Sequence, residues 1–176
     1  IYGDPIVDAA AVSLNSGFRF SDAISGYATA IASNRDIPSF AFYRGSGNTN
    51  NILSIYPDGF VPEINMLSKD RSLVAGIKGG TESGWNWDLS YNYGYNHIDF
   101  WTQNSLNRSL GPNSPTRFYD GALEDTQNIV NADVNKTVDW GLAYPATRSF
   151  GAEYRSEKWH QAPGEANAYS ARTVRG

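Results

Sequence analysis

The sequence has 176 residues, of which 18% are charged and 14% aromatic, and its formal net charge is −4. A soluble domain usually has about 25% charged residues, so the surplus of aromatic side chains must be buried or must face a medium other than water. The acidic balance argues against nucleic acid as a partner, the lack of cysteine rules out disulfides and cysteine-ligated metals, and no apolar run is long enough for a spanning helix.

The first two predicted strands lie near the start of the chain. Residues 10–20 alternate apolar side chains with polar ones, which is the period of a strand. Residues 26–35 show a weaker alternation, and the stretch between the two segments is rich in turn-forming residues. Residues 36–68 have no clear period and contain Pro-Asp-Gly with flanking Asn and Gly, so we expect a long loop there.

The sharpest alternation occurs over residues 84–101, which follow a predicted strand at 71–79 and the short turn "GGTESG". From position 85 onward every second residue is apolar or aromatic, and the residues between are polar or small. A helix could not separate these two sets, whereas a strand points them to opposite faces. We expect a strand with one apolar face and one polar face.

The second half of the chain repeats this organisation. Residues 102–124 are irregular and centre on "LGPNSPTRFYDG", which predicts a second long loop. Residues 125–136 and 147–159 alternate again and predict two more strands, with a moderate turn between them. The sequence therefore predicts about six long strands joined alternately by short turns and long loops.

This organisation favours an all-β fold, an antiparallel up-and-down segment of a transmembrane β-barrel with short periplasmic turns and long extracellular loops. At about 3.3 Å per residue and a tilt near 40°, the strand from Trp85 to Tyr95 climbs about 25 Å, the height of the apolar band of such barrels. Six strands cannot close a wide barrel, so the segments 10–20 and 147–159 would each have an unpaired edge. The sequence begins at Ile1 without an initiator Met or a signal segment, and we expect a piece of a longer polypeptide.

The barrel interpretation assigns a solvent to each face of the strands. The predicted lipid-facing side chains are Trp85, Trp87, Leu89, Tyr91, Tyr93, Tyr95, Phe150 and Tyr154. The predicted lumen-lining side chains are Asn86, Asp88, Ser90, Asn92, Asp133, Glu153, Arg155 and Glu157. Tryptophan and tyrosine at the two ends of the longest alternating segment are typical of aromatic girdles at a membrane surface.

Three stretches carry a resemblance to a known family. They are "IYPDGFVPEI", "WDLSYNYGYNHIDFWTQNSLNRSLGPNSPTRFYDG" and "FGAEYRSEKWHQAPGEANAYS", and they resemble the early barrel strands of TonB-dependent outer-membrane receptors over nearly the whole chain. The resemblance implies a barrel of roughly 22 strands with a plugged lumen. It also implies import of a scarce nutrient, such as an iron chelate, cobalamin or an oligosaccharide, with energy transmitted by TonB.

The same resemblance implies the partners of the chain. In this family the plug domain and the TonB-contacting segment precede the barrel, and neither is found in the sequence. The expected partners are therefore outer-membrane lipid, a small-molecule or oligosaccharide ligand, and the TonB complex through the missing N-terminal region. A passive porin-like channel and a soluble carbohydrate-binding β-sandwich are the alternatives that share the strand pattern.

Aromatic and arginine side chains in or beside the two long loops are the candidate ligand-binding groups, because ring faces stack on sugars and on aromatic chelators. They are Tyr43, Arg44, Tyr56, Phe60, Arg117, Phe118 and Tyr119. Packing of the loops against each other is the alternative role for these residues. We expect no catalytic residue, metal or cofactor, because nucleophile and phosphate-loop motifs are missing and the pair His97 and Asp99 alone is a weak metal signal.

Overall fold

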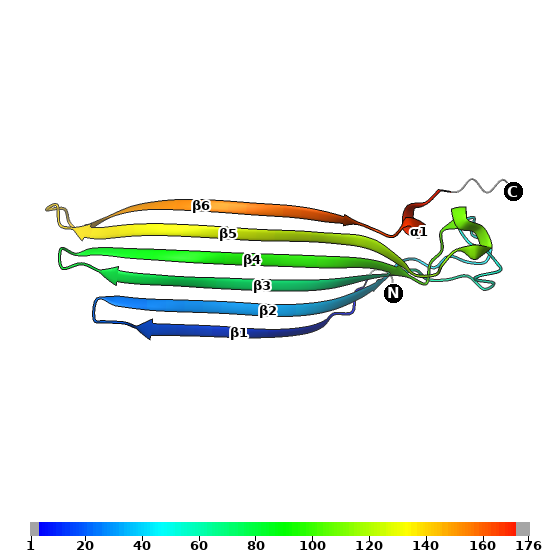
Figure 1. Ribbon diagram of the computed structural model, residues 1–176, viewed down its shortest axis with the longest axis horizontal. Coiled ribbons are helices and arrows are strands. Elements are labelled where there is room, and N and C mark those ends of the chain that lie inside the picture. The colour runs from blue at the N-terminus through cyan, green and yellow to red at the C-terminus, as the bar shows by residue number, and fades with distance from the viewer. Residues whose placement is uncertain (1–3, 172–176) are drawn as a thin grey trace.

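The computed structural model describes residues 4–171 and shows six strands in one antiparallel sheet (Figure 1). The strands are β1 (Asp8–Arg19), β2 (Ile24–Phe40), β3 (Glu63–Gly80), β4 (Trp85–Gln103), β5 (Phe118–Val138) and β6 (Ala146–Pro163). Each strand pairs with its neighbours in the sequence, in the order β1-β2-β3-β4-β5-β6. The predicted all-β, antiparallel up-and-down fold is confirmed.

Short and long connections alternate along the chain. Residues 20–23, 81–84 and 139–145 make the turns at one end of the sheet, and the loops 41–62 and 104–117 lie at the other end (Figure 1). The second loop contains a short 3-10 helix, η1 (Arg108–Asn113), and a single helical turn, α1 (Ala166–Tyr169), follows β6. All long connections are thus on one rim of the sheet.

The strands extend further toward the long loops than the sequence predicts. The predicted loop 36–68 is confined to residues 41–62, and β5 begins at Phe118, inside the predicted loop 102–124. Near this rim apolar side chains occur on the otherwise polar face and polar side chains on the otherwise apolar face. The alternation of apolar and polar residues therefore no longer marks a strand there. Ile37 and Met66, for example, are paired on the face that is polar elsewhere in the sheet.

The register of the ladders extends the alternation of β4 across the neighbouring strands. Leu89 lies opposite Ile77 and Ala132, whereas the adjacent Ser90 lies opposite Gly76 and Asn131. The face that carries Leu89 is called the apolar face, and it includes Leu14, Phe18, Leu73, Ile77, Trp87, Tyr91, Tyr93, Val130, Val134, Phe150 and Tyr154. The opposite face, which carries Ser90, is called the polar face.

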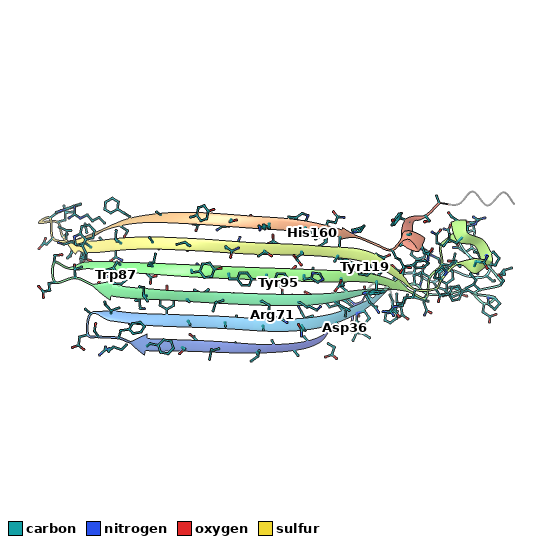
Figure 2. All side chains as sticks on the ribbon, viewed as in Figure 1. Asp36, Arg71, Trp87, Tyr95, Tyr119 and His160 are labelled. Carbon is teal, nitrogen blue, oxygen red and sulfur yellow. The ribbon has the colours of Figure 1, made fainter. Side chains whose placement is uncertain are left out.

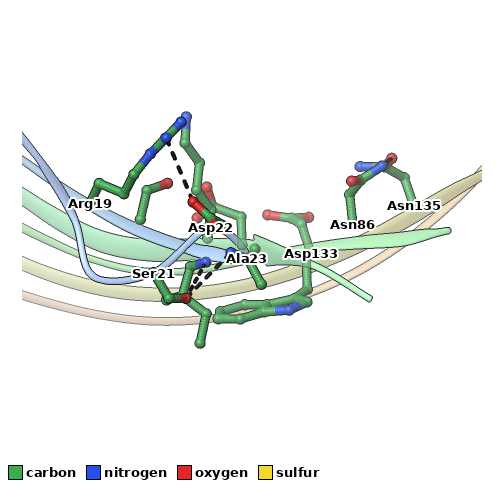
Figure 3. Close-up of a pocket in the computed structure, with 13 residues that line it drawn as sticks. Arg19, Ser21, Asp22, Ala23, Asn86, Asp133 and Asn135 are labelled. Carbon is green, nitrogen blue, oxygen red and sulfur yellow. Dashed lines mark hydrogen bonds and ion pairs between the residues drawn. The ribbon is translucent and has the colours of Figure 1, made fainter. Parts of the chain in front are cut away.

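The sheet is curved, and the polar face lies on its concave side. In the close-up of Figure 3 the ribbon forms a shallow arc, and Asn86, Asp133 and Asn135 project from its inner side. A right-handed twist and coiling of long antiparallel strands produces such curvature. A curved sheet of this kind encloses space on the polar side and turns the apolar side outward.

Within residues 4–171 the fold has almost no buried core. Its buried hydrophobic core there consists of Phe60, Leu106, Phe118 and Ala122, all in or near the long-loop end. Large apolar side chains of the strands are exposed instead, among them Val12 at 68%, Phe150 at 61% and Tyr154 at 70%. An apolar face of this extent is too large for contact with water, so the sheet requires another apolar medium or partner on that side.

The first and last strands form open edges. Strand β1 pairs only with β2, and β6 pairs only with β5. An unpaired edge of a long strand presents a row of backbone donors and acceptors to any further strand. No helix within residues 4–171 has both the length and the hydropathy needed to cross a membrane.

Candidate functional site

The apolar face carries a band of aliphatic side chains between two sets of aromatic rings. Trp87 lies near the short-turn end of the sheet and Tyr95 nearer its middle (Figure 2). At the turn itself, the Trp85 ring lies 5.8 Å from the Lys136 ammonium and 5.4 Å from the Arg148 guanidinium. The rings and cations at this end match the chemistry of a membrane–water boundary, where Trp and basic side chains are enriched.

Beyond Tyr95 the same face becomes polar through a chain of hydrogen bonds. The Tyr95 hydroxyl donates to Glu124 over 3.0 Å, and the Glu124 carboxylate lies 3.2 Å from Nδ1 of His97. On its other side His97 approaches Asp99 at 3.1 Å, and Asp99 accepts from the Tyr119 hydroxyl over 3.0 Å. This cluster marks the limit of the apolar band toward the long loops.

The cluster contains His97 and Asp99, the pair that the sequence gives as a weak signal for a metal site. Both ring nitrogens of His97 face carboxylates, which accounts for the pair without an ion. Among the described residues no group of three or more metal-ligating side chains is arranged to hold a metal.

The polar face carries hydrogen bonds both between neighbouring strands and within β6. Asn86 donates to Asn135 over 3.2 Å, and on β6 the Arg155 guanidinium bonds to Glu153 at 3.1 Å and to Glu157 at 3.3 Å. All eight residues predicted to line a lumen lie on this face, and all eight residues predicted to face lipid lie on the other. Glu153 and Glu157 share the Arg155 cation within one strand. The Asn86–Asn135 bond joins β4 to β5, and a bond from the Gln127 amide to Glu157 joins β5 to β6.

Sequence reasoning missed Tyr27 of β2 as a residue of the polar face. The ring lies over Gly76, where a Cβ atom would come within 2.5 Å of it, and the hydroxyl donates to Asp88 over 2.8 Å. A glycine in one strand that leaves room for an aromatic ring from the next is a known pairing in curved sheets. The sequence sign of this packing is Gly76 in the neighbouring strand β3, and it can be recognised only once the pairing of β2 with β3 is known.

A shallow pocket of about 340 Å³ lies on the polar face at the short-turn end (Figure 3). Its lining includes Lys78, Asp88 and Asp133, together with residues of the β1–β2 turn. That turn is held by Ser21, whose hydroxyl oxygen accepts the backbone N–H of Ala23 at 3.3 Å. Charges of both signs line the pocket, and none of its lining residues is buried. The pocket therefore does not favour one class of ligand.

The two long loops pack on each other at the opposite end of the sheet. The rings of Tyr56 and Phe60 are stacked with centroids 4.5 Å apart, and the Arg44 guanidinium lies 5.5 Å from the Phe60 ring. The Tyr56 hydroxyl donates across to the backbone oxygen of Ser105 in the second loop. Burial in this contact raises the pKa of Tyr56 above its usual value. The loops thus form one small layer over the end of the sheet.

A second pocket, called the loop pocket, lies between these two loops and the ends of β4 and β5. Its volume is about 320 Å³. Its main lining side chains are Arg44, Asn50, Thr102, Arg108, Phe118 and Asp120. Thr102 shares the parity of the polar face in β4, so the pocket continues the concave side of the sheet.

The structure divides the predicted ligand-binding residues into four groups. Arg44 and Phe118 line the loop pocket, and Tyr56 and Phe60 form the packed layer beside it. Tyr43 is half exposed and donates its hydroxyl to the backbone oxygen of Asp58.

Arg117 and Tyr119 lie away from this pocket. The Arg117 guanidinium stacks 4.2 Å from the ring of Trp101, and the Tyr119 hydroxyl bonds to Asp99. Phe118 and Tyr119 are strand residues at the start of β5, not loop residues, so their side chains point to opposite faces.

Sequence reasoning missed Arg108 and Asp120 as lining residues. Arg108 opens the short helix η1, and Asp120 is the extra residue of a β-bulge where the register of β4 and β5 shifts between Phe100 and Trp101. A bulge turns a side chain out of the regular alternation. Neither feature leaves a periodic mark in the sequence, so only the folded geometry reveals them.

Comparison with known proteins gives no relative: no family model, no curated protein and no solved structure matches the chain.

Proposed function

We propose that the chain is a section of the barrel wall of an outer-membrane receptor of the TonB-dependent type. In this proposal the receptor binds a scarce nutrient, an iron chelate, cobalamin or an oligosaccharide, and imports it with energy transmitted by TonB. The observation that carries the proposal is the chemistry of the two faces, with an aromatic-bounded apolar band on the convex side and a hydrogen-bonded polar surface on the concave side.

The dimensions of the apolar band support a membrane on the convex side. Ten residue steps separate Trp85 from Tyr95, and both lie in one uninterrupted strand. At about 3.3 Å per step and a tilt near 40° the band is about 25 Å high. The hydrogen-bonded cluster around His97 then lies outside the hydrocarbon, where charged side chains are solvated.

The short turns at one end of the sheet and the long loops at the other support one orientation of the chain across the membrane. Outer-membrane barrels have short turns on the periplasmic side and longer loops on the extracellular side. The three turns of this sheet would therefore face the periplasm, and the loop pocket would face the outside. A ligand would meet the loop layer first and then pass along the polar face after the energised rearrangement of a plug.

A soluble β-sandwich fits the structure less well. Strands of 12 to 21 residues are much longer than the usual 5 to 6. A sandwich would also need a second sheet over the apolar face, and within residues 4–171 nothing covers that face. The open edges at β1 and β6 instead suit continuation into further strands of a barrel.

A passive porin-like channel shares all of these strand features and remains the second candidate. The resemblance of three sequence stretches to TonB-dependent receptors favours the receptor. An enzymatic role gains no support, because Glu153 and Glu157 are both hydrogen-bonded to Arg155 and are not poised as a separate acid and base.

The test uses the full-length protein that contains this chain, expressed with its own export signal. We expect it in the outer-membrane fraction, and we expect planar bilayers that contain the purified protein to show no steady conductance, because a plug fills the lumen. A steady open-pore conductance would favour the porin, and recovery in the soluble fraction without detergent would contradict both membrane interpretations.

A further inference from the structure

We propose that the loop pocket binds an anionic group, a carboxylate, phosphate or sulfate carried by a small ligand. This inference rests on the proposed function and deepens it by naming the chemical class of the ligand that the extracellular side takes.

Two arginines line the pocket without a carboxylate partner. Among the described residues neither Arg44 nor Arg108 takes part in an ion pair, although the chain as a whole is acidic. The Arg44 guanidinium lies 5.7 Å from the Phe42 ring and 5.5 Å from the Phe60 ring. Contact with ring faces leaves the in-plane N–H donors of an arginine available to a ligand.

The one carboxylate of the pocket already has a partner. Asp120 accepts a hydrogen bond from the Thr102 hydroxyl. With Arg44 and Arg108 on the lining, the formal charge there is two positive against one negative. The lining therefore carries a surplus of positive charge that no carboxylate of residues 4–171 neutralises through an ion pair.

The walls and the floor of the pocket are held in place before a ligand arrives. The Asn107 amide donates to the backbone oxygens of Asn167 and Ser170 at 2.8 and 3.0 Å, and its own oxygen accepts the backbone N–H of Ser109. Phe118, 4% exposed, contributes a buried apolar surface. A fixed site loses less conformational entropy on binding, which favours affinity.

The size of the pocket limits the ligand part that it can hold. A volume of about 320 Å³ is at the lower end of the roughly 300 to 1,000 Å³ of small-molecule sites. One compact unit fits, with its anionic group between the two arginines and its ring or aliphatic part against Phe118. Arginine binds planar carboxylate and phosphate groups through two parallel hydrogen bonds, which gives selectivity over neutral ligands.

The experiment measures binding by isothermal titration calorimetry on the full-length receptor in detergent, at low salt. The probes are glucuronate, glucose 6-phosphate and glucose, which offer a carboxylate, a phosphate and no charge on similar rings. We expect one or both anions to bind and glucose to bind at least about tenfold more weakly, as expected when a charge-assisted hydrogen bond is lost. The anion that binds identifies the source of the charge.

Two variants and a matched control locate the site. Arg108→Gln, at a side chain without a protein partner in residues 4–171, is expected to weaken anion binding about tenfold. Arg117→Gln removes the same charge from the same loop but beside Trp101, and we expect it to leave binding unchanged. Asp120→Asn removes the only carboxylate of the pocket and is expected to tighten anion binding severalfold, a gain that misfolding could not produce.

Three results would overturn the proposal: no binding of either anion, equal binding of glucose, or equal loss of binding in Arg108→Gln and Arg117→Gln. If these occur while the protein still behaves as a plugged outer-membrane barrel, the pocket assignment fails and the proposed function stands. If the protein is not a membrane barrel, both fail, so the two outcomes are distinguishable.

Discussion

The substitution Leu89→Arg tests the energetic consequence of a lipid-facing strand surface. Leu89 lies on the apolar face opposite Ile77 and Ala132 and is 45% exposed. It is one residue from the midpoint between Trp85 and Tyr95, or about 2.5 Å along the barrel axis. An arginine at this depth costs about 2–4 kcal/mol in a transmembrane barrel, because the charge must be placed in hydrocarbon.

The matched control is Ser90→Arg, one residue further along the same strand. Ser90 lies on the polar face opposite Gly76 and Asn131, so the added charge meets water and polar groups. We expect a change within about 0.5 kcal/mol for this variant. Urea unfolding of the full-length protein in lipid vesicles, followed by tryptophan fluorescence, gives both free energies. Equal costs for the two variants, or a larger cost for Ser90→Arg, would refute the lipid-facing assignment.

Two further predictions concern the long-loop end. Gly121 has φ +112°, and a Cβ there would collide with the Ala162 carbonyl oxygen, whereas a Cβ at Gly94 would make an ordinary 3.8 Å contact. Gly121→Ala is therefore expected to cost about 1–3 kcal/mol of unfolding free energy in urea titrations, and equal effects of Gly121→Ala and Gly94→Ala would contradict the bulge geometry. The pKa of the Tyr56 hydroxyl is higher in the folded protein than in the unfolded chain. The protonated hydroxyl therefore contributes fully to the free energy of unfolding below the unfolded pKa of about 10, and this contribution is lost as the pH rises through the folded pKa. Unfolding midpoints between pH 9 and 11 should fall more in the wild type than in Tyr56→Phe, and parallel curves would contradict burial of this hydroxyl.

The alternation of polar and apolar residues was sufficient to predict the sheet and its two faces. In β4 the pattern from Trp85 to Tyr95 is strict, because one side of the strand must be apolar throughout and the other polar. Antiparallel neighbours joined by short turns then follow from the sequence order. The fold class and the membership of each face in this region required no long-range information.

The long-loop end could not be predicted in the same way. Near this rim the polar face takes up Ile37 and Met66, and the apolar face takes up the His97 cluster, so the period no longer marks a strand. The loop pocket depends on Arg44 and Arg108, which are far apart in the sequence and line one pocket only because the loops pack together. Local patterns hold no information on such a contact.

The central claim, that the convex face meets lipid and the concave face meets water, can be measured directly at two adjacent residues. The chain contains no cysteine, so Val130→Cys on the apolar face and Asn131→Cys on the polar face can each carry one fluorescent label in the full-length protein in vesicles. Our account predicts that brominated acyl chains quench the label at position 130 and that aqueous iodide quenches the label at position 131. Quenching of both labels by iodide, with no effect of the brominated lipid, would contradict it.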